Sequence, residues 1–246
     1  MSVLIEACVD SVASALAAER GGAQRVELCD SLFDGGTTPS AGMISAVKAA
    51  VRIPVVVIVR PRGGGFVYER DELGVMRLDV EAAKMFGADG IAIGALTRER
   101  RVDVEAMRAL VDAALPLPVT FHRAFDLAVN LDDALEALIQ LGVTRVLTSG
   151  GATTALEGVE RIAALHRRAA GQITVMAGGG IREETVQEIV HRSQVRDVHV
   201  RGARLTAAPG ATHSPVRFRK PLPPSEDAWE ETDEQRIRDF VKLANG

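Results

Sequence analysis

Two short segments of the chain share a pattern of acid and thiol. Glu6 lies two residues before Cys8, and Glu27 lies two residues before Cys29, in runs that are otherwise apolar. Side chains two residues apart on a strand lie on the same face, so the pattern predicts two carboxylates in one layer and two thiols in the layer above. The carboxylates are candidates for acid–base catalysis, and two neighbouring thiols are a soft ligand set of the kind that Cu(I) prefers.

Plainer interpretations of these four residues stay open. Cysteine is often a small buried apolar side chain, which would account for Cys8 and Cys29 without a metal. Either glutamate could face outward into solvent. A glutamate that faces the core needs a partner, because this residue is almost never buried alone.

A charged, glycine-rich segment follows another apolar run. Arg60 and Arg62 are separated by one proline and followed by three glycines, 63–65. Two fixed positive charges on a glycine-rich loop predict a segment that closes over an anion through bidentate guanidinium contacts. The alternative is that Arg60 neutralises Glu6 or Glu27 as a buried ion pair.

A histidine with charged neighbours ends a further apolar run. His122 is followed directly by Arg123, and Asp126 comes within the next turn. The spacing predicts an acid–base unit in which Asp126 orients or charge-stabilises His122. A satisfied core histidine is the alternative.

Small and glycine residues end two later runs, and a second histidine lies in the last one. Glycine turns between a strand and a helix often bind anions through backbone N–H groups, although packing alone also favours them. The candidate ligand-binding residues of this part of the chain are Thr148, Ser149, Gly150, Gly178, Gly179 and His199.

The elements that must position these residues alternate along the whole chain. Eight apolar, β-branched runs are separated by segments of helical character, such as 11–21 and 131–142. Strict alternation predicts a parallel sheet with right-handed crossovers, and eight units favour a closed α/β barrel, a single (β/α)8 TIM-type domain over 1–246. An open doubly wound sheet is the alternative, but no GxGxxG follows the first strand. The predicted strands are 3–9, 25–29, 55–60, 90–96, 118–123, 145–150, 173–178 and 197–202.

The end of the chain departs from this alternation. Residues 203–231 are rich in proline, arginine and acidic residues and predict a long loop, and 232–244 predict a capped closing helix. In a barrel of this type the site lies at the C-terminal ends of the strands, where all the polar residues named above are found.

Composition excludes several functional classes. A net charge of −4 over 246 residues gives no broad cationic surface for nucleic acid, and two cysteines are too few for a secreted disulfide scaffold. No apolar run is long enough to span a membrane, and the N-terminus has no signal-peptide pattern. We therefore expect a cytoplasmic protein without membrane or nucleic-acid partners. Self-association stays open.

Several of these sequence motifs occur together in one known family: the chain resembles the CutC family, named for copper homeostasis. The resemblance implies a TIM-type barrel and a cytoplasmic copper-handling role, with Cys8 and Cys29 as Cu(I) ligands. The chain departs from the family pattern at Val200-Arg201, after His199, and over Arg217–Glu231. The resemblance depends on Val26-Glu27-Leu28-Cys29, Gly35-Gly36-Thr37-Thr38-Pro39-Ser40, Arg60-Pro61-Arg62-Gly63-Gly64, Val119-Thr120-Phe121-His122-Arg123-Ala124-Phe125-Asp126 and Arg145-Val146-Leu147-Thr148-Ser149-Gly150.

Two functions follow as hypotheses. In the first, one copper ion binds Cys8 and Cys29 on adjacent strands, with His122 across the barrel mouth. In the second, the barrel is an isomerase, epimerase or lyase acting on a small anionic or phosphorylated sugar-like molecule. The second uses Glu6, Glu27, His122 and Asp126 as acids and bases and the arginines as anion ligands. A purely structural protein would leave the polar strand ends unexplained.

Overall fold

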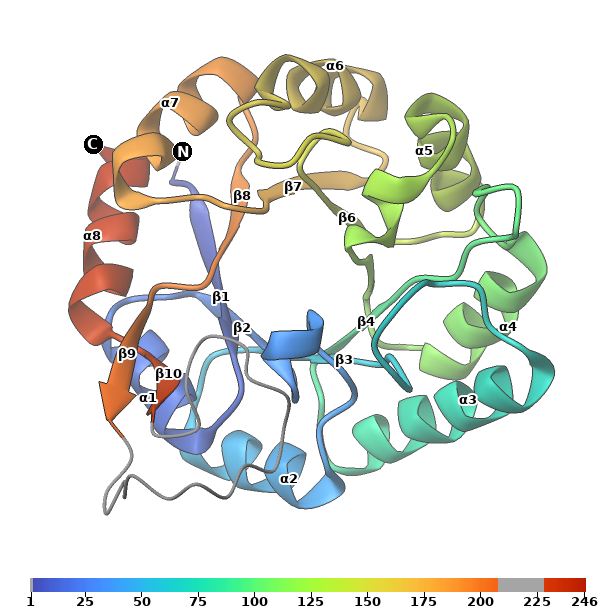
Figure 1. The fold of residues 1–246 in the computed structure, drawn as a ribbon, viewed down its shortest axis with the longest axis horizontal. Coiled ribbons are helices and arrows are strands. Elements are labelled where there is room, and N and C mark those ends of the chain that lie inside the picture. The colour runs from blue at the N-terminus through green and yellow to red at the C-terminus, as the bar shows by residue number, and fades with distance from the viewer. Residues whose placement is uncertain (1, 208–227) are drawn as a thin grey trace, which may run out of the picture.

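The predicted parallel barrel is confirmed in the computed structural model, which describes residues 2–207 and 228–246. Eight strands close in sequence order, and the first pairs with the last (Figure 1). The strands are β1 (Leu4–Val9), β2 (Arg25–Leu28), β3 (Val55–Ile58), β4 (Gly90–Ile93), β5 (Val119–Phe121), β6 (Arg145–Thr148), β7 (Thr174–Gly178) and β8 (Asp197–Val200).

Several strands end earlier than the sequence predicts. β3 ends at Ile58 rather than Arg60, and β5 ends at Phe121 rather than Arg123. The polar residues therefore lie just beyond the carboxyl ends of the strands, where the chain turns toward the next helix. This is the end of a barrel at which side chains from different strands meet.

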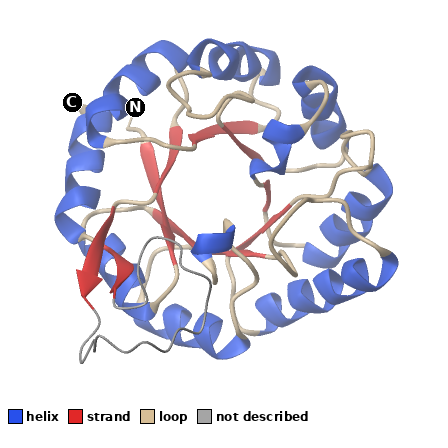
Figure 2. Ribbon diagram, viewed as in Figure 1, coloured by secondary structure: helices blue, strands red, loops and turns tan. Residues whose placement is uncertain are grey.

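Helices surround the barrel on its outer side (Figure 2). Polar caps start them where the sequence predicts: Ser11 accepts from the backbone of Ser14, and Asn130 accepts from Asp132 and Asp133. No helix among the described residues is long and apolar enough to cross a membrane. The helices are α1 (Val12–Arg20), α2 (Ala41–Ala50), α3 (Arg70–Met85), α4 (Val104–Ala114), α5 (Leu131–Gln140), α6 (Val159–Ala169) and α7 (Glu183–Ser193).

The strands divide the apolar residues into two clusters. On β1, Ile5, Ala7 and Val9 belong to the large cluster that includes buried helix residues. The alternate residue Cys8 belongs to a small cluster inside the barrel, together with Cys29, Val56, Ile58 and Ala92. The period-two alternation of the strands therefore directs the remaining alternate positions, Glu6 among them, into the barrel interior.

The region after β8 differs from the predicted long loop over 203–231. Residues Ala203–Ala207 form β9, which pairs antiparallel with β10 (Ala228–Thr232). Residues 208–227, which include most of the divergent Arg217–Glu231 segment, lie outside the described residues. The last helix, α8 (Glu234–Asn245), begins after the cap Asp233 and buries Ile237, Phe240 and Ala244.

The junction of α1 and α8 allows a direct test of this packing. A Cβ at Gly21 would lie 2.6 Å from Ile237 Cβ and 2.7 Å from the Glu234 carbonyl oxygen. We expect Gly21→Ala to lower the free energy of unfolding by about 1–3 kcal/mol, because neither neighbour can move without shifting α8. Urea denaturation measures the change.

The matched control is Gly74→Ala in the middle of α3, where a Cβ meets nothing within 4 Å. That variant should be more stable than the wild type by about 0.5–1 kcal/mol, because alanine is the better helix former. Equal effects of the two substitutions would contradict the close packing of α1 and α8.

Candidate functional site

β1 and β2 bring the two acid-and-thiol segments together inside the barrel. The Sγ atoms of Cys8 and Cys29 are 3.7 Å apart, and Cys29 Sγ is 3.4 Å from Glu27 Oε2. The side chains of Cys8, Glu27 and Cys29 are buried, and their donor atoms lie within 4.8 Å of one another. The predicted layers are wrong in part: the four side chains do enter the barrel, but Glu27 pairs in register with Cys8 and Glu6 pairs with Arg25, so the two carboxylates do not share one layer.

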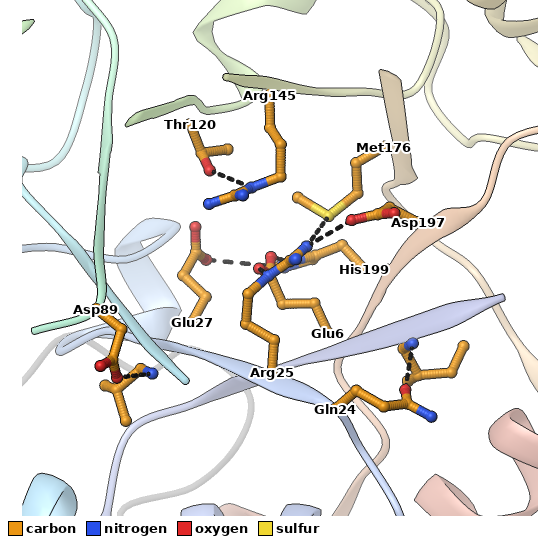
Figure 3. A network of polar contacts seen from close by, with 12 residues as sticks. Glu6, Gln24, Arg25, Glu27, Asp89, Thr120, Arg145, Met176, Asp197 and His199 are labelled. Carbon is orange, nitrogen blue, oxygen red and sulfur yellow. Dashed lines mark hydrogen bonds and ion pairs between the residues drawn. The ribbon is translucent and has the colours of Figure 1, made fainter. Parts of the chain in front are cut away.

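A charged network of Glu6, Arg25, Asp197 and His199 adjoins Glu27 of this cluster (Figure 3). Arg25 Nε donates to Glu6, and Arg25 Nη2 donates to Asp197 Oδ2 at 2.9 Å. On its other oxygen, Glu6 Oε1 is 2.8 Å from His199 Nδ1, and His199 Nε2 is 3.7 Å from Glu27 Oε2. The His199 ring therefore lies between the carboxyl groups of Glu6 and Glu27.

Glu6 is held ionised by this network. Burial alone would raise its pKa, but the hydrogen bond from His199 and the charges of Arg25 and His199 outweigh it and lower the pKa to about 2. For His199, burial lowers the pKa, yet the opposing charges of Glu27 and Glu6 and the contact with Cys8 raise it well above its usual value. The imidazole is therefore a cation between two carboxyl groups.

Glu27 behaves in the opposite way. Burial raises the pKa of its carboxyl to about 8, because the charge of His199 offsets burial only in part and the charges of Cys8 and Glu6 add to it. The pKa values of the two glutamates of the repeated pattern are therefore shifted in opposite directions, that of Glu6 down and that of Glu27 up. Environments that separate the pKa values of two neighbouring acids are characteristic of acid–base sites.

The two thiols also differ from each other. Hydrogen bonding from Cys29 lowers the pKa of Cys8 to about 5 against the effect of burial, with help from His199 and Arg201. The pKa of Cys29 is raised well above its usual value by its contact with Cys8 and by burial. The pair therefore holds one thiolate and one thiol, and the thiolate is the form that binds metals.

Arg60 does not neutralise either glutamate, contrary to one of the sequence interpretations. Its Nη1 donates to the carbonyl oxygens of Asp34 and Gly36 at 2.7 and 2.8 Å, and its Nη2 donates to Gly64 at 2.8 Å. Arg60 lies in a turn that follows β3, where the carbonyl groups of two loops converge. Arg25 is the arginine that pairs with Glu6.

Arg62 is an exposed residue with partners of its own. It forms an ion pair with Glu72 of α3 and donates to the carbonyl oxygens of 63, 65 and 67. These contacts fold the loop after β3 back on itself. The guanidinium of Arg62 is therefore occupied by the protein.

The predicted His122–Asp126 unit is not formed. His122 Nδ1 accepts from the Ala124 backbone N–H at 3.2 Å, and burial and the charge of Arg60 lower the pKa of His122 to about 3. Asp126 lies in the short 3₁₀ helix η2 (Arg123–Leu127), which turns its carboxylate toward β6. There it accepts from the hydroxyl of Thr148 and the backbone of Ser149.

The glycine turns after β6 and β7 are explained by packing. A Cβ at Gly150 would lie 2.5 Å from the Gly158 carbonyl oxygen, one at Gly178 would lie 2.5 Å from Leu147, and one at Gly179 would lie 2.3 Å from Arg123 Nη1. Arg123 in turn pairs with Asp126 and donates to Ser149 Oγ at 2.8 Å. The predicted anion-binding residues of this side already bind one another.

Arg25, Asp197 and Met176 complete the network and were not predicted from the sequence. Arg25 Nη2 is 3.3 Å from Met176 Sδ in addition to its contacts with the acids. The alternation that places Glu27 and Cys29 in the barrel also places Arg25, two residues earlier, on the same face. That signal was present in the sequence. The partners from β7 and β8 depend on closure of the barrel and carry no local signal.

Comparison with known proteins identifies relatives over nearly the whole chain. The CutC family model matches residues 3–203. A copper homeostasis protein cutC homolog of Homo sapiens is 46% identical over 243 residues, which cover 98% of this chain and 89% of the relative. A family protein CutC of Xanthomonas campestris is 44% identical, with 97% of this chain and 98% of the relative covered.

Solved structures give the same assignment. The putative copper homeostasis protein CutC from Streptococcus agalactiae superposes with a TM-score of 0.77 and 35% identity, covering 80% of this chain and 97% of that one. Thiamine phosphate pyrophosphorylase from Pyrococcus furiosus superposes with a TM-score of 0.61 at 16% identity. The second likeness shows the barrel fold alone.

Proposed function

The chain belongs to the CutC family, and from that premise we propose that it is a cytoplasmic copper-handling protein that binds Cu(I) between Cys8 and Cys29. The observation that carries the proposal is the distance of 3.7 Å between the Sγ atoms of two buried cysteines. Cu(I) prefers soft thiolate ligands, and two are present in this cluster, while the imidazole of His199 belongs to the adjoining group with Glu6 and Glu27.

The spacing of the thiols suits a shared metal ion. Two sulfurs bound to one ion at roughly 2.3 Å, with the 120° angle of a three-donor site between them, stand about 4.0 Å apart. The observed 3.7 Å is close to this value, so the two side chains need little movement to share an ion. Val56, Ile58 and Ala92 surround the thiols, and such an apolar surrounding favours a soft ion over a strongly hydrated one.

His199, rather than His122, is the imidazole that we assign as the third donor. Its Nδ1 faces Glu6 at 2.8 Å, while Nε2 lies 3.7 Å from Glu27 Oε2, and the ring acts on the thiol of Cys8. A carboxylate that holds one ring nitrogen and leaves the other for the metal is the usual support of a histidine ligand. Metal binding would displace the proton from Nε2.

The test is anaerobic Cu(I) titration in competition with a chromophoric chelator. We expect the Cys8→Ser, Cys29→Ser double variant to lose the tight site, and His199→Gln to bind at least about tenfold more weakly, because each substitution removes a donor. His191→Gln, which removes an exposed histidine of α7, is the matched control and should bind as the wild type does. Circular dichroism checks that each variant is folded.

A wild-type protein without tight Cu(I) binding, or a double variant with undiminished affinity, would contradict the proposal. The barrel-enzyme hypothesis would then account better for the cluster. The feature in its favour is the lowered pKa of Glu6 and the raised pKa of Glu27 on one charge network, joined through His199.

A further inference from the structure

Three buried polar atoms on the β3–β5 side of the barrel lack hydrogen-bond partners in the described part of the chain. They are Arg60 Nε, Tyr68 Oη and His122 Nε2. Their side chains are 5%, 8% and 4% exposed, so bulk water does not compensate them. Buried groups of this kind nearly always have a partner, and an isolated exception points to a bound molecule.

Arg60 adds an uncompensated charge to this cluster. Its two terminal nitrogens donate to backbone carbonyl oxygens only, and none of the ion pairs among residues 2–207 and 228–246 includes it. Arg25 and Arg123, in contrast, each pair with a carboxylate. A buried guanidinium without a carboxylate is costly, and an anionic ligand at Nε would offset that cost.

His122 presents a donor to the same region. Because its Nδ1 accepts from the Ala124 N–H, the neutral ring carries its proton on Nε2. Burial and the charge of Arg60 lower its pKa to about 3, so the ring is neutral at physiological pH. His122 is thus a fixed neutral N–H donor rather than a base.

Phe66 lies against Arg60 and His122, and Arg60 in turn adjoins Tyr68. The Arg60 guanidinium carbon lies 4.9 Å from the centre of the Phe66 ring. The centres of the Phe66 and His122 rings are 5.0 Å apart. Arg60 also lies beside the phenol of Tyr68, two residues further along the same loop, close enough to act on its pKa but not within direct hydrogen-bond geometry. A Cβ at Gly94 would lie 2.6 Å from His122 Cε1, so this glycine makes room for the imidazole.

We propose that Arg60, Tyr68 and His122 form a binding site for a small oxyanion, a carboxylate or a phosphate, with Phe66 as its apolar wall. A guanidinium N–H, a phenol O–H and an imidazole N–H supply three donors and one positive charge, and none of them supplies a negative charge. The site shares no residue with Cys8, Cys29 or His199. Its existence therefore does not depend on copper binding.

The test uses acetate and inorganic phosphate as probes. We expect calorimetry to detect binding of one of them to the wild-type protein, and the bound anion to shift the ¹⁵N resonance of His122 Nε2. Which of the two anions binds identifies the ligand class as a carboxylate or a phosphate. Absence of any shift with both anions would overturn the proposal. A high-resolution crystal structure grown with both anions that shows an ordered water only on the three donors would do the same.

Two variants remove one donor each. Tyr68→Phe deletes only the Oη atom, and His122→Asn retains an acceptor for the Ala124 N–H while deleting Nε2. Each should raise the Kd of the anion at least about tenfold, because hydrogen bonds to a charged group are strong. Without anion, Tyr68→Phe should be as stable as the wild type or more stable, since it removes an unpaired buried donor. His122→Asn removes ring atoms that pack against Phe66 and Phe121 and brings a new amide donor, so circular dichroism must show that it is folded.

His166→Asn on α6 is the control and should change neither property. A folded variant at Tyr68 or His122 that binds the anion as tightly as the wild type would contradict the assignment. Reduced anion binding together with unchanged Cu(I) affinity would separate this site from the thiol cluster.

Discussion

Substituting glutamine for Glu6 is expected to lower the free energy of unfolding at pH 7 by about 3–5 kcal/mol, the largest effect of any single change to the barrel interior. Glu6 is buried between Arg25 and His199, and the loss of its charge leaves two buried cations with less compensation. Urea denaturation of the copper-free protein measures the difference. The midpoint should fall while the m-value stays unchanged.

The stability of the wild-type protein at acid pH should also depend on the charge of Glu6. The pKa of Glu6 is lowered from 4.5 to about 2 in the folded state, so its contribution is fully present above the unfolded value. That contribution is lost as the pH falls from about 4.5 toward 2. Glu6→Gln should be less sensitive to pH in that window.

Glu81→Gln is the matched control. Glu81 pairs with Arg77 on the exposed surface of α3, and its loss should cost less than about 1 kcal/mol. Similar losses for Glu6→Gln and Glu81→Gln would show that the buried network does not stabilise the folded state.

Glu27→Gln is expected to raise the free energy of unfolding of the copper-free protein at neutral and alkaline pH, the opposite of the effect of Glu6→Gln. Burial is the main cause that raises the pKa of Glu27 to about 8, against 4.5 in the unfolded chain. Between these two values the folded protein holds a proton that the unfolded chain releases, so stability falls as the pH rises. The neutral amide removes this dependence.

The measurement is the free energy of unfolding at several pH values from 4 to 9 for both proteins. As the pH rises from 4.5 to 8, the free energy of unfolding of the wild type should fall relative to that of Glu27→Gln by up to about 1.4 kcal/mol for each pH unit. Parallel curves over this range would mean that Glu27 is ionised in the folded state, contrary to its surroundings. The two variants at positions 6 and 27 thus test one network from both sides.

The fold could be predicted because its determinants are local. Apolar runs such as 55–59 are buried on both faces, and capped helical segments follow each run, so alternation alone selects a parallel barrel. The boundary errors do not share one cause: β5 stops before the polar residues His122 and Arg123, whereas β3 and β4 stop before buried apolar residues such as Val59 and Leu96, which leave the sheet without a signal in their residue types. The pairing of β9 with β10 is non-local, and the polar composition of 203–231 concealed it.

Within the site, the sequence predicted which face of a strand each side chain occupies better than it predicted which residues pair with one another. Period two places Glu6, Cys8, Glu27 and Cys29 inside the barrel, but it does not say which cation crosses the interior to meet them. Arg60 was the arginine nearest the candidate loops, yet its side chain binds carbonyl groups and Arg25 takes the carboxylate. Proximity along the chain also misled for Asp126, because a 3₁₀ turn directs it toward β6 and away from His122.

The charge network on β1, β2 and β8 has a consequence for how the barrel closes. Glu6 is the register partner of Arg25 on one side and of His199 on the other, at the seam where the first strand meets the last. A slip of two residues at this seam would keep every apolar side chain on its proper face, so hydrophobic patterning does not prevent it. The same slip would move Glu6 from His199, and Arg25 from Asp197, by roughly 6.6 Å and leave opposite charges apart in a dry interior. The buried ions therefore select one shear of the barrel among those that the apolar residues would accept.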